Sequence, residues 1–234
     1  MTVAESKSHA TLRAEALEAL ALERFTCRAF RPDRVPDSTI EAILATAQRS
    51  PSWCNTQPWQ LLITRGEGTQ RFREALYQRA SEGGEEADFP FPRAYQGVYQ
   101  ERRRECGFQL YASLGIGRGA REEARRQMLE NFRLFGAPHV AILTTDEALG
   151  VYGAIDCGAY LMMFLLAAQS QGIATAPQAA LASQSGFIRD YFKLGPDRRM
   201  VCGVSFGFAD ADHPANGFRT GRAAISQSTT WIDE

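Results

Sequence analysis

Arginines near both ends of the chain have the chemistry to bind one anionic group. The candidates form three pairs: Arg24 and Arg28, Arg31 and Arg34, and Arg219 and Arg222. A guanidinium group binds phosphate through two parallel hydrogen bonds, and the glycine-containing segment NGFRTGR around the last pair can add backbone N–H groups. Each arginine alone could equally be a solvated surface residue, so a shared phosphate site requires the two chain ends to meet.

The segment PSWCNTQPW, Pro51–Trp59, is rich in groups that recognise a flat heterocycle. The amides of Asn55 and Gln57 offer donors and acceptors to a ring edge, and the indoles of Trp53 and Trp59 offer stacking surface. A structural turn before a strand, the alternative, would explain the prolines but explains this density of amides and indoles less well. We therefore interpret the segment as a ligand-binding turn.

Composition and charge exclude several classes of protein. The five cysteines are scattered without a C-x-x-C pair, and the chain has only three histidines. This argues against a metal site and a disulfide framework. The chain carries 26 basic and 27 acidic residues, so a general nucleic-acid-binding surface is not expected. The first twenty residues lack the pattern of a secretory signal, and together with the scattered thiols this predicts a soluble cytoplasmic protein.

Two literal motif matches fail on their context. Gly203–Gly207 reads G-x-S-x-G, but a turn rather than a helix is expected after Ser205, so a hydrolase nucleophile is not predicted. Gly115–Ala120 reads G-x-G-x-x-A, but the residues before it favour a helix rather than the strand that a dinucleotide site needs. We expect a core strand and a turn between helices at these two places.

Local patterns predict one domain over residues 1–234 with mixed helices and strands. Helices are expected over 10–23, from about 37 to before Pro51, and over 70–80, 99–113 and 119–134, with strands over 59–64, 138–145 and 200–208. The long connection 81–97 is typical of a lid or binding loop. It carries the aromatic side chains Phe89, Phe91 and Tyr95, which could cover a substrate or only hold the loop down.

No charged residue occurs from Cys157 to Ile188. The apolar part of this run is shorter than the ~20 residues of a membrane span, so we expect a helix over 154–171 that is buried on all sides and ends at Gly172. Such a helix belongs at the centre of a fold or at a dimer interface. The small residues over 173–182 would let a flat ligand approach the backbone.

Four blocks in this order resemble the FMN-dependent nitroreductases. They are R-x-T-x-R-x-F over 24–30, PSWCNTQPW over 51–59, GIATAPQAA over 172–180 and RTGR over 219–222. The segment 102–138 resembles the branch that contains nitrobenzoate reductases. The resemblance implies an α+β fold, with a central, mainly antiparallel sheet wrapped by helices, in an intertwined homodimer with FMN at the subunit interface.

The resemblance also implies a role for each block. The expected cofactor-binding residues are Arg24, Thr26, Arg28, Pro51, Ser52, Trp53, Asn55, Gln57, Pro177, Gln178, Ala179, Arg219 and Arg222. Residues of the second block would reach FMN from the opposite subunit, and the backbone of Gln178 and Ala179 would lie near flavin N5. Arg219 and Arg222 match the phosphate-binding block.

The implied reaction is transfer of a hydride from NADPH or NADH to FMN and then of electrons to a nitroaromatic, at one site and with ping-pong kinetics. FMN carries this chemistry, so no catalytic side chain and no metal are expected. Residues 81–135 would form a lid-like insertion, with Phe89, Phe91 and Tyr95 over the substrate. Reductive dehalogenation, enone reduction, flavin destruction and non-catalytic flavin binding remain alternatives.

Overall fold

The computed structural model describes residues 8–233 and contains a four-stranded antiparallel sheet. The strands are β1 (Gln60–Ile63), β2 (His139–Asp146), β3 (Ala174–Gln178) and β4 (Arg198–Gly207), in the order β1-β2-β4-β3. This confirms the expected α+β class with an antiparallel sheet. Residues 1–7 lie outside the described part, so the expectation about a signal segment is not addressed there.

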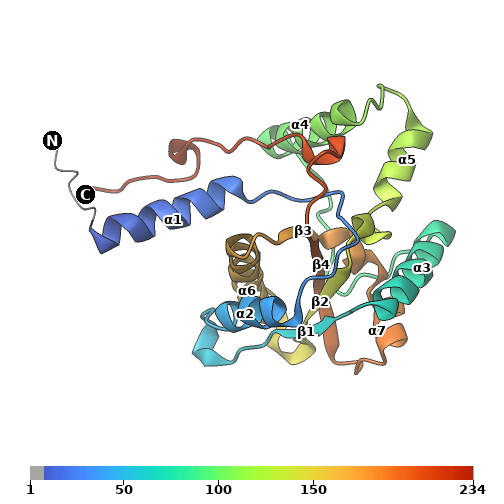
Figure 1. The fold of residues 1–234 in the computed structure, drawn as a ribbon, viewed down its shortest axis with the longest axis horizontal. Coiled ribbons are helices and arrows are strands. Elements are labelled where there is room, and N and C mark those ends of the chain that lie inside the picture. Colours follow the sequence, from blue (N-terminus) through green and yellow to red (C-terminus); the bar gives the residue numbers. More distant parts are fainter. Residues whose placement is uncertain (1–7, 234) are drawn as a thin grey trace.

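Helices cover both faces of the sheet (Figure 1). The helices are α1 (His9–Glu23), α2 (Asp37–Ala47), α3 (Glu67–Glu82), α4 (Gly97–Ser113), α5 (Arg121–Leu129), α6 (Gly150–Ser170) and α7 (Ser185–Phe192). One core cluster joins α2 and α6 to the sheet through side chains such as Ile43, Phe164 and Phe206. A second joins α3 and α7 to it through Phe72, Ile142 and Ile188. The central strands are therefore buried on both faces.

One strand was missed by the sequence patterns. Residues 174–178, expected only as a small-residue segment, form β3, which pairs with β4 along Ala174↔Gly207 to Gln178↔Gly203. Alanines and a proline give no strand signal. Pro177 is tolerated because β3 lies at the edge of the sheet, where its missing N–H leaves no ladder bond unmade.

One expectation about helices was wrong. The helix predicted over 119–134 ends at Leu129, and the chain then turns through Leu134 and Phe135, both at positive φ. These two side chains are buried in different core clusters, and the turn directs each into its own. Helix α6 exposes Tyr152, Ile155 and Met162 by 43–58% in the single chain, so the burial on all sides that was expected at the centre of the fold or at a dimer interface is not reached within one chain.

Helix α6 ends where the sequence indicates. Gly172 follows it at φ +71°, the left-handed conformation that glycine adopts after a helix without strain. Within residues 8–233 the segment Glu147–Ser170 is long and apolar enough to span a membrane, but 39% of its apolar window is buried against the molecule. The core helix of a soluble protein has the same properties, and α6 packs on α2 and the sheet.

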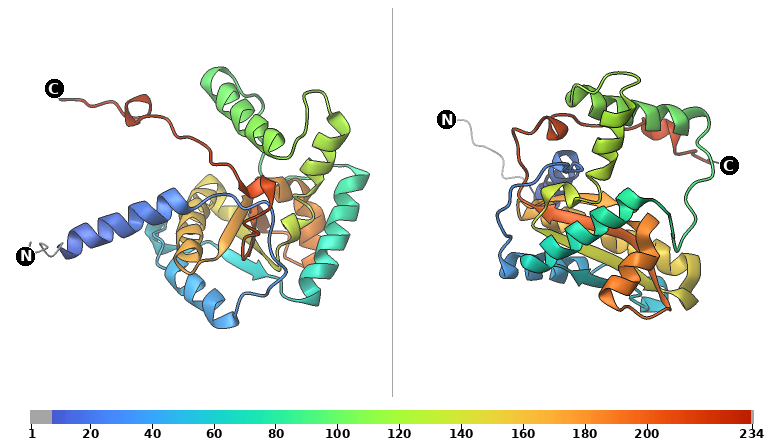
Figure 2. Two further views of the ribbon diagram at one scale, coloured as in Figure 1. Left: turned by 45° about the horizontal axis from the view of Figure 1, so that its top comes forward. Right: turned by 90° about the vertical axis from the view of Figure 1, so that its right-hand side faces the viewer.

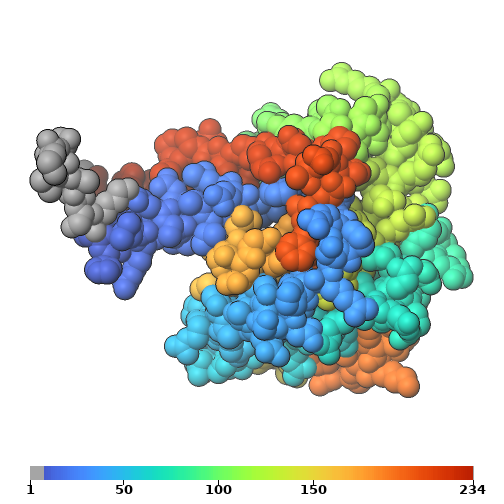
Figure 3. All heavy atoms as spheres, in the orientation of Figure 1, coloured from blue at the N-terminus to red at the C-terminus, as the bar shows by residue number. Residues whose placement is uncertain are grey.

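Helix α1 and the C-terminal segment project from the same side of the body (Figures 1 and 2). No residue of α1 is buried, and Leu12, Leu17 and Leu22 are 49–74% exposed. In the space-filling view α1 forms an arm that extends from the body (Figure 3). A 15-residue helix is only marginally stable in water by itself, so these exposed leucines favour packing of α1 against a partner surface.

The ring of His139, the first residue of β2, connects this strand to the segments around Val35 and Thr64. Its Nε2 accepts the Val35 N–H (3.1 Å), and its Nδ1 lies 3.2 Å from the Thr64 carbonyl oxygen, to which it donates. The ring also stacks on Phe206. Burial is the main cause that lowers the pKa of His139 below its ordinary value, so the folded protein holds the neutral ring.

We expect the free energy of unfolding to fall as the pH drops below about 6.5, because unfolded His139 then binds a proton that the folded ring does not, with a slope of up to ~1.4 kcal/mol per pH unit. Urea unfolding between pH 7.5 and 5.5, at one protein concentration, measures this. His139→Gln should flatten the pH dependence. An equal slope in both proteins would assign the effect to other groups.

Candidate functional site

The first and last candidate blocks meet beside β3. Thr26 forms a β-bridge with Thr175, and Cys27 N–H donates to the Thr175 carbonyl at 2.9 Å. The backbone N–H of Arg28 donates to the Asn216 side-chain oxygen at 2.7 Å, and the Asn216 amide donates to the Ala29 carbonyl at 2.9 Å. Buried Asn216 therefore joins the C-terminal loop to a segment 188 residues earlier.

Four predicted arginines line one cavity at this junction. The cavity has a volume of about 200 Å³ and is lined by Arg24, Thr26, Arg28, Arg219 and Arg222, with Phe25, Phe218, Cys106 and Thr220 among its other residues. We call it the arginine cavity. Arg219 lies 3.8 Å over the Phe25 ring and donates to the carbonyls of Asn216 and Phe218. Arg28 lies 5.6 Å over the Phe218 ring.

Within the described part of the chain, no carboxylate balances the charge of the arginine cavity. Within residues 8–233, none of its four arginines forms an ion pair with a carboxylate. Burial and then repulsion from Arg222 lower the pKa of Arg24, and burial lowers the pKa of Arg28. A bound anion would relieve both effects, so the residues fit a phosphate group.

The other candidate pair lies elsewhere. Arg31 forms an exposed ion pair with Asp33 at 2.9 Å, and the guanidinium of Arg34 lies against Gly66. Neither lines the arginine cavity. The structure therefore brings together two of the three pairs.

Gln178 and Ala179 lie at the end of β3, the strand that contacts Thr26 at this junction. The side chain of Gln178 is buried, accepts the Ser205 hydroxyl at 2.6 Å and donates to the Asn131 carbonyl at 2.8 Å. Because the Gln178 side chain is used in these internal hydrogen bonds, only the backbone of Gln178 could contact a ligand. Ala179 is exposed and begins the 3₁₀ helix η4 (Ala179–Gln184), whose first N–H groups have no acceptor within the helix.

The motif Gly203–Gly207 serves packing. Ser205 is fully buried and its hydroxyl is used by Gln178, so it is not a nucleophile. A Cβ on Gly203 would approach Leu181 Cδ2 to 2.5 Å, so this glycine lets η4 lie directly on β4. The other rejected motif, Gly115–Ala120, connects α4 to α5 without a strand. Both rejections are confirmed.

The segment 51–57 forms a turn between α2 and β1 and does not line the arginine cavity of its own chain. Three residues other than glycine lie at positive φ there: Cys54, Asn55 and Gln57. The turn is held on α6, where both carboxylate oxygens of Asp156 accept the Trp53 N–H at 3.1–3.2 Å. The Trp53 ring meets Tyr152 edge to face, with centroids 4.6 Å apart.

Some side chains of this turn form hydrogen bonds within it, and others are exposed and form none there. Ser52 Oγ accepts the Gln57 N–H at 2.9 Å, and the Gln57 side chain bonds Gln48 and the Asn55 carbonyl. In contrast, the side chains of Asn55 and Trp53 are exposed, and within the described chain the Asn55 amide group has no hydrogen-bond partner. Asn55 and Trp53 are thus the residues here that can reach a ligand.

The three lid candidates lie in the connection 83–96 between α3 and α4. Phe89 is half-buried, Phe91 and Tyr95 are 40% and 42% exposed, and none lines the arginine cavity. Helix α4 itself flanks that cavity through Cys106. A neighbouring cavity of about 690 Å³ lies between α4 and the C-terminal loop, where Arg102 donates to the Gln227 side chain at 3.0 Å.

Asn216, Asp156 and Asn131 position the site and were not singled out from the sequence. Each acts on a segment far away in the chain through one side chain, so no local pattern identifies it. The glycine after Asn216 was the only nearby signal.

Comparison with known proteins agrees with this geometry. Residues 21–208 match the model of the nitroreductase family. The chain is 39% identical over 218 residues to nitroreductase NfnB of Mycolicibacterium smegmatis, covering 92% of both, and 31% identical over 205 residues to a 4-nitrobenzoate reductase of Pseudomonas putida, covering 88% and 90%.

A solved structure extends the likeness to the fold. The FMN-dependent nitroreductase NfnB from Mycobacterium smegmatis, in complex with NADPH, superposes with a TM-score of 0.90 at 38% identity, covering 94% of this chain and 99% of that one. Family model, sequence identity and fold lead to one conclusion: this chain belongs to the nitroreductase family.

Proposed function

We propose that this protein is an FMN-dependent oxidoreductase that uses NADPH or NADH to reduce nitroaromatic compounds by a ping-pong mechanism. The observation that carries the proposal is the arginine cavity, where four guanidinium groups from both chain ends meet and, within residues 8–233, pair with no carboxylate. The relatives are named as FMN- and NADPH-dependent nitroreductases and as nitrobenzoate reductases.

The chain binds and orients, while FMN, when bound, supplies the hydride chemistry. Arg24, Arg219 and Arg222 would hold the phosphate, and the Thr26 hydroxyl would lie beside it. Arg28 would bring positive charge to the ring and stabilise the negative charge that arrives with the electrons. The backbone of Pro177, Gln178 and Ala179 would face the reacting edge of the ring. No acid or base on the protein is needed.

We also propose a homodimer in which a second copy completes each site. Exposed apolar side chains on α1, on α6 and in the C-terminal segment support it, among them Leu17, Ile155 and Trp231. The turn 51–57 lies outside the arginine cavity of its own chain, so Pro51, Ser52, Trp53 and Asn55 would serve the FMN of the other subunit. Ser52 and Gln57 would act by holding the turn.

The remaining features fit a soluble, cytoplasmic protein of one domain over 1–234. Residues 81–135, with α4 and α5, would form the lid-like insertion, and Phe89, Phe91 and Tyr95 would contact the aromatic substrate. The closest alternatives within the family fold are reductive dehalogenation and enone reduction. A non-catalytic flavin-binding protein is the alternative from another class.

The absorption spectrum of the purified protein, before and after anaerobic NADPH, tests the proposal. We expect a flavin spectrum that bleaches on reduction and returns when a nitrobenzoate is added. A flavin that NADPH does not bleach would favour the non-catalytic alternative, and a protein that does not take up FMN would refute both. Faster turnover of halogenated phenols than of nitrobenzoates would favour reductive dehalogenation as the activity. Faster turnover of enones would favour enone reduction.

A further inference from the structure

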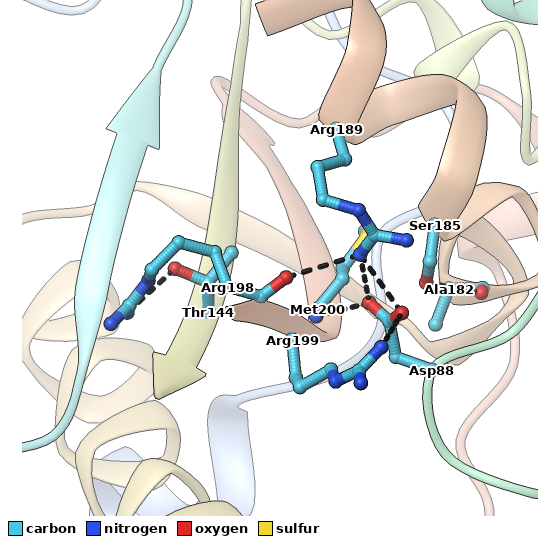
Figure 4. A network of polar contacts seen from close by, with 8 residues as sticks. All are labelled: Asp88, Thr144, Ala182, Ser185, Arg189, Arg198, Arg199 and Met200. Carbon is cyan, nitrogen blue, oxygen red and sulfur yellow. Dashed lines mark hydrogen bonds and ion pairs between the residues drawn. The ribbon is translucent and has the colours of Figure 1, made fainter. Parts of the chain in front are cut away.

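A buried carboxylate lies in the connection 83–96, near the start of the lid-like insertion. The side chain of Asp88 is 3% exposed, and it lies among Arg189, Arg199 and Met200 (Figure 4). Both of its oxygens accept from Arg189 Nη1 at 2.9 Å, one accepts from Arg199 Nη1 at 3.3 Å, and the Met200 N–H donates at 2.8 Å. One aspartate thus joins the connection to α7 and to β4, with two arginines balancing its charge.

The backbone on the N-terminal side of Asp88 is held as well. Glu86 N–H donates to the Ser183 carbonyl at 2.8 Å, and Gln184 Nε2 donates to the Gly84 carbonyl at 2.9 Å. These partners belong to η4, the 3₁₀ helix that starts at Ala179. Residues 84–88 are therefore attached to the same segment that presents the Ala179 backbone.

The backbone after Asp88 is free of such attachments. Within the described structure, residues 89–96 form no hydrogen bond or ion pair with the sheet, with η4 or with α7; the Tyr95 ring lies under Arg103 of α4. Helix α4, which follows, has no buried residue. The attached part of the connection ends, and the free part begins, at Asp88.

We propose that Asp88 is a positioning residue that sets where the unattached part of the lid-like insertion starts relative to η4, and so determines how well a bulky aromatic acceptor is held. This inference rests on the proposed function. A buried aspartate suits the task because its charge-assisted bonds to two elements are short and directional. Removing that charge would leave Arg189 facing no carboxylate in a mostly buried place.

Asp88→Asn tests this with little change in shape. We expect the KM for 4-nitrobenzoate to rise about tenfold, while turnover with ferricyanide, a small acceptor that needs no lid, changes less than about twofold. We also expect trypsin to cleave the native protein after Arg93, the one basic residue of the connection 83–96, several times faster. Cleavage is identified by fragment mass and requires no activity.

Asp33→Asn is the matched control, because Asp33 forms an exposed ion pair with Arg31 at the same 2.9 Å distance. It should leave both readouts unchanged. If Asp88→Asn does not fold, Arg199→Gln replaces it as the test, because Arg199 is partly exposed and supplies one of the contacts to Asp88. It should raise the KM for 4-nitrobenzoate and the cleavage rate, each by less than expected for Asp88→Asn.

Two results would overturn the inference. One is a folded Asp88→Asn protein with unchanged cleavage and unchanged KM for 4-nitrobenzoate. The other is an equal loss with ferricyanide and 4-nitrobenzoate, which indicates a structural role only. Failure of the proposed function is a separate result: the wild-type flavin would not be reduced by NADPH, whereas the cleavage experiment would still decide whether Asp88 holds the connection.

Discussion

Replacing Arg219 and Arg222 together with alanine is expected to weaken FMN binding roughly 100- to 1000-fold, because two charge-assisted contacts to phosphate are lost. Both residues line the arginine cavity together with Arg24 and Arg28, and within residues 8–233 neither is paired with a carboxylate. Arg219 is held by two carbonyls and the Phe25 ring, and Arg222 is close enough to Arg24 to lower its pKa. Titration of the apoprotein with FMN, followed by flavin fluorescence, measures the dissociation constant.

The matched control for this double variant is Arg65→Ala with Arg71→Ala. Those two arginines form exposed ion pairs with Asp37 and Glu67 and do not line the arginine cavity, and the double change removes the same net charge. FMN affinity should be unchanged in the control. Equal FMN affinity in both double variants would show that the arginine cavity does not bind the phosphate of FMN.

The second large effect concerns the subunits. Trp53→Ala with Asn55→Gly is expected to weaken FMN binding about 100-fold, because an aromatic contact and an amide hydrogen bond are lost. Asn55 lies at φ +56°, a conformation that glycine adopts without strain, so glycine is the replacement chosen. Thr56→Ala, at the neighbouring exposed position, is the control and should retain the flavin.

Mixing this variant with the Arg219→Ala, Arg222→Ala variant then shows whether each FMN site is built from one chain or from two. If each FMN lies between two copies, a mixed dimer has one site with both defects and one intact site. Random re-association of equal amounts should therefore restore flavin to about one quarter of all sites, although each variant alone retains almost none. A site built within one chain would recover nothing on mixing, which would contradict the proposed interface.

The local chemistry of the chain was sufficient to predict much of the fold. Helix α2 begins after Pro36, α6 ends before Gly172, and the apolar runs around residues 60 and 140 form strands, because propensity, capping and burial patterns act within a few residues. Where two core clusters compete, as at Leu134 and Phe135, local patterns extended the helix too far. Only the tertiary packing separates those side chains.

The residue types of the candidate site were also readable from the sequence, but their assembly was not. Arginines at positions 24 and 219 are evident as anion ligands by their chemistry. Their meeting depends on Asn216 and on the pairing of β3 with β4, which are contacts between segments far apart in the chain. Such contacts form from the packing of the whole molecule and leave no periodic signal.

The sequence by itself thus determined the chemical groups, the order of the blocks and the near-neutral charge of the chain. The tertiary structure alone decided which arginines share a cavity, which side chains of the turn 51–57 are used internally, and that Asp88 holds the connection to α4. The physical reason is that hydrogen bonding and charge pairing require particular atoms within about 3 Å, and only the folded chain brings atoms from distant segments to that distance.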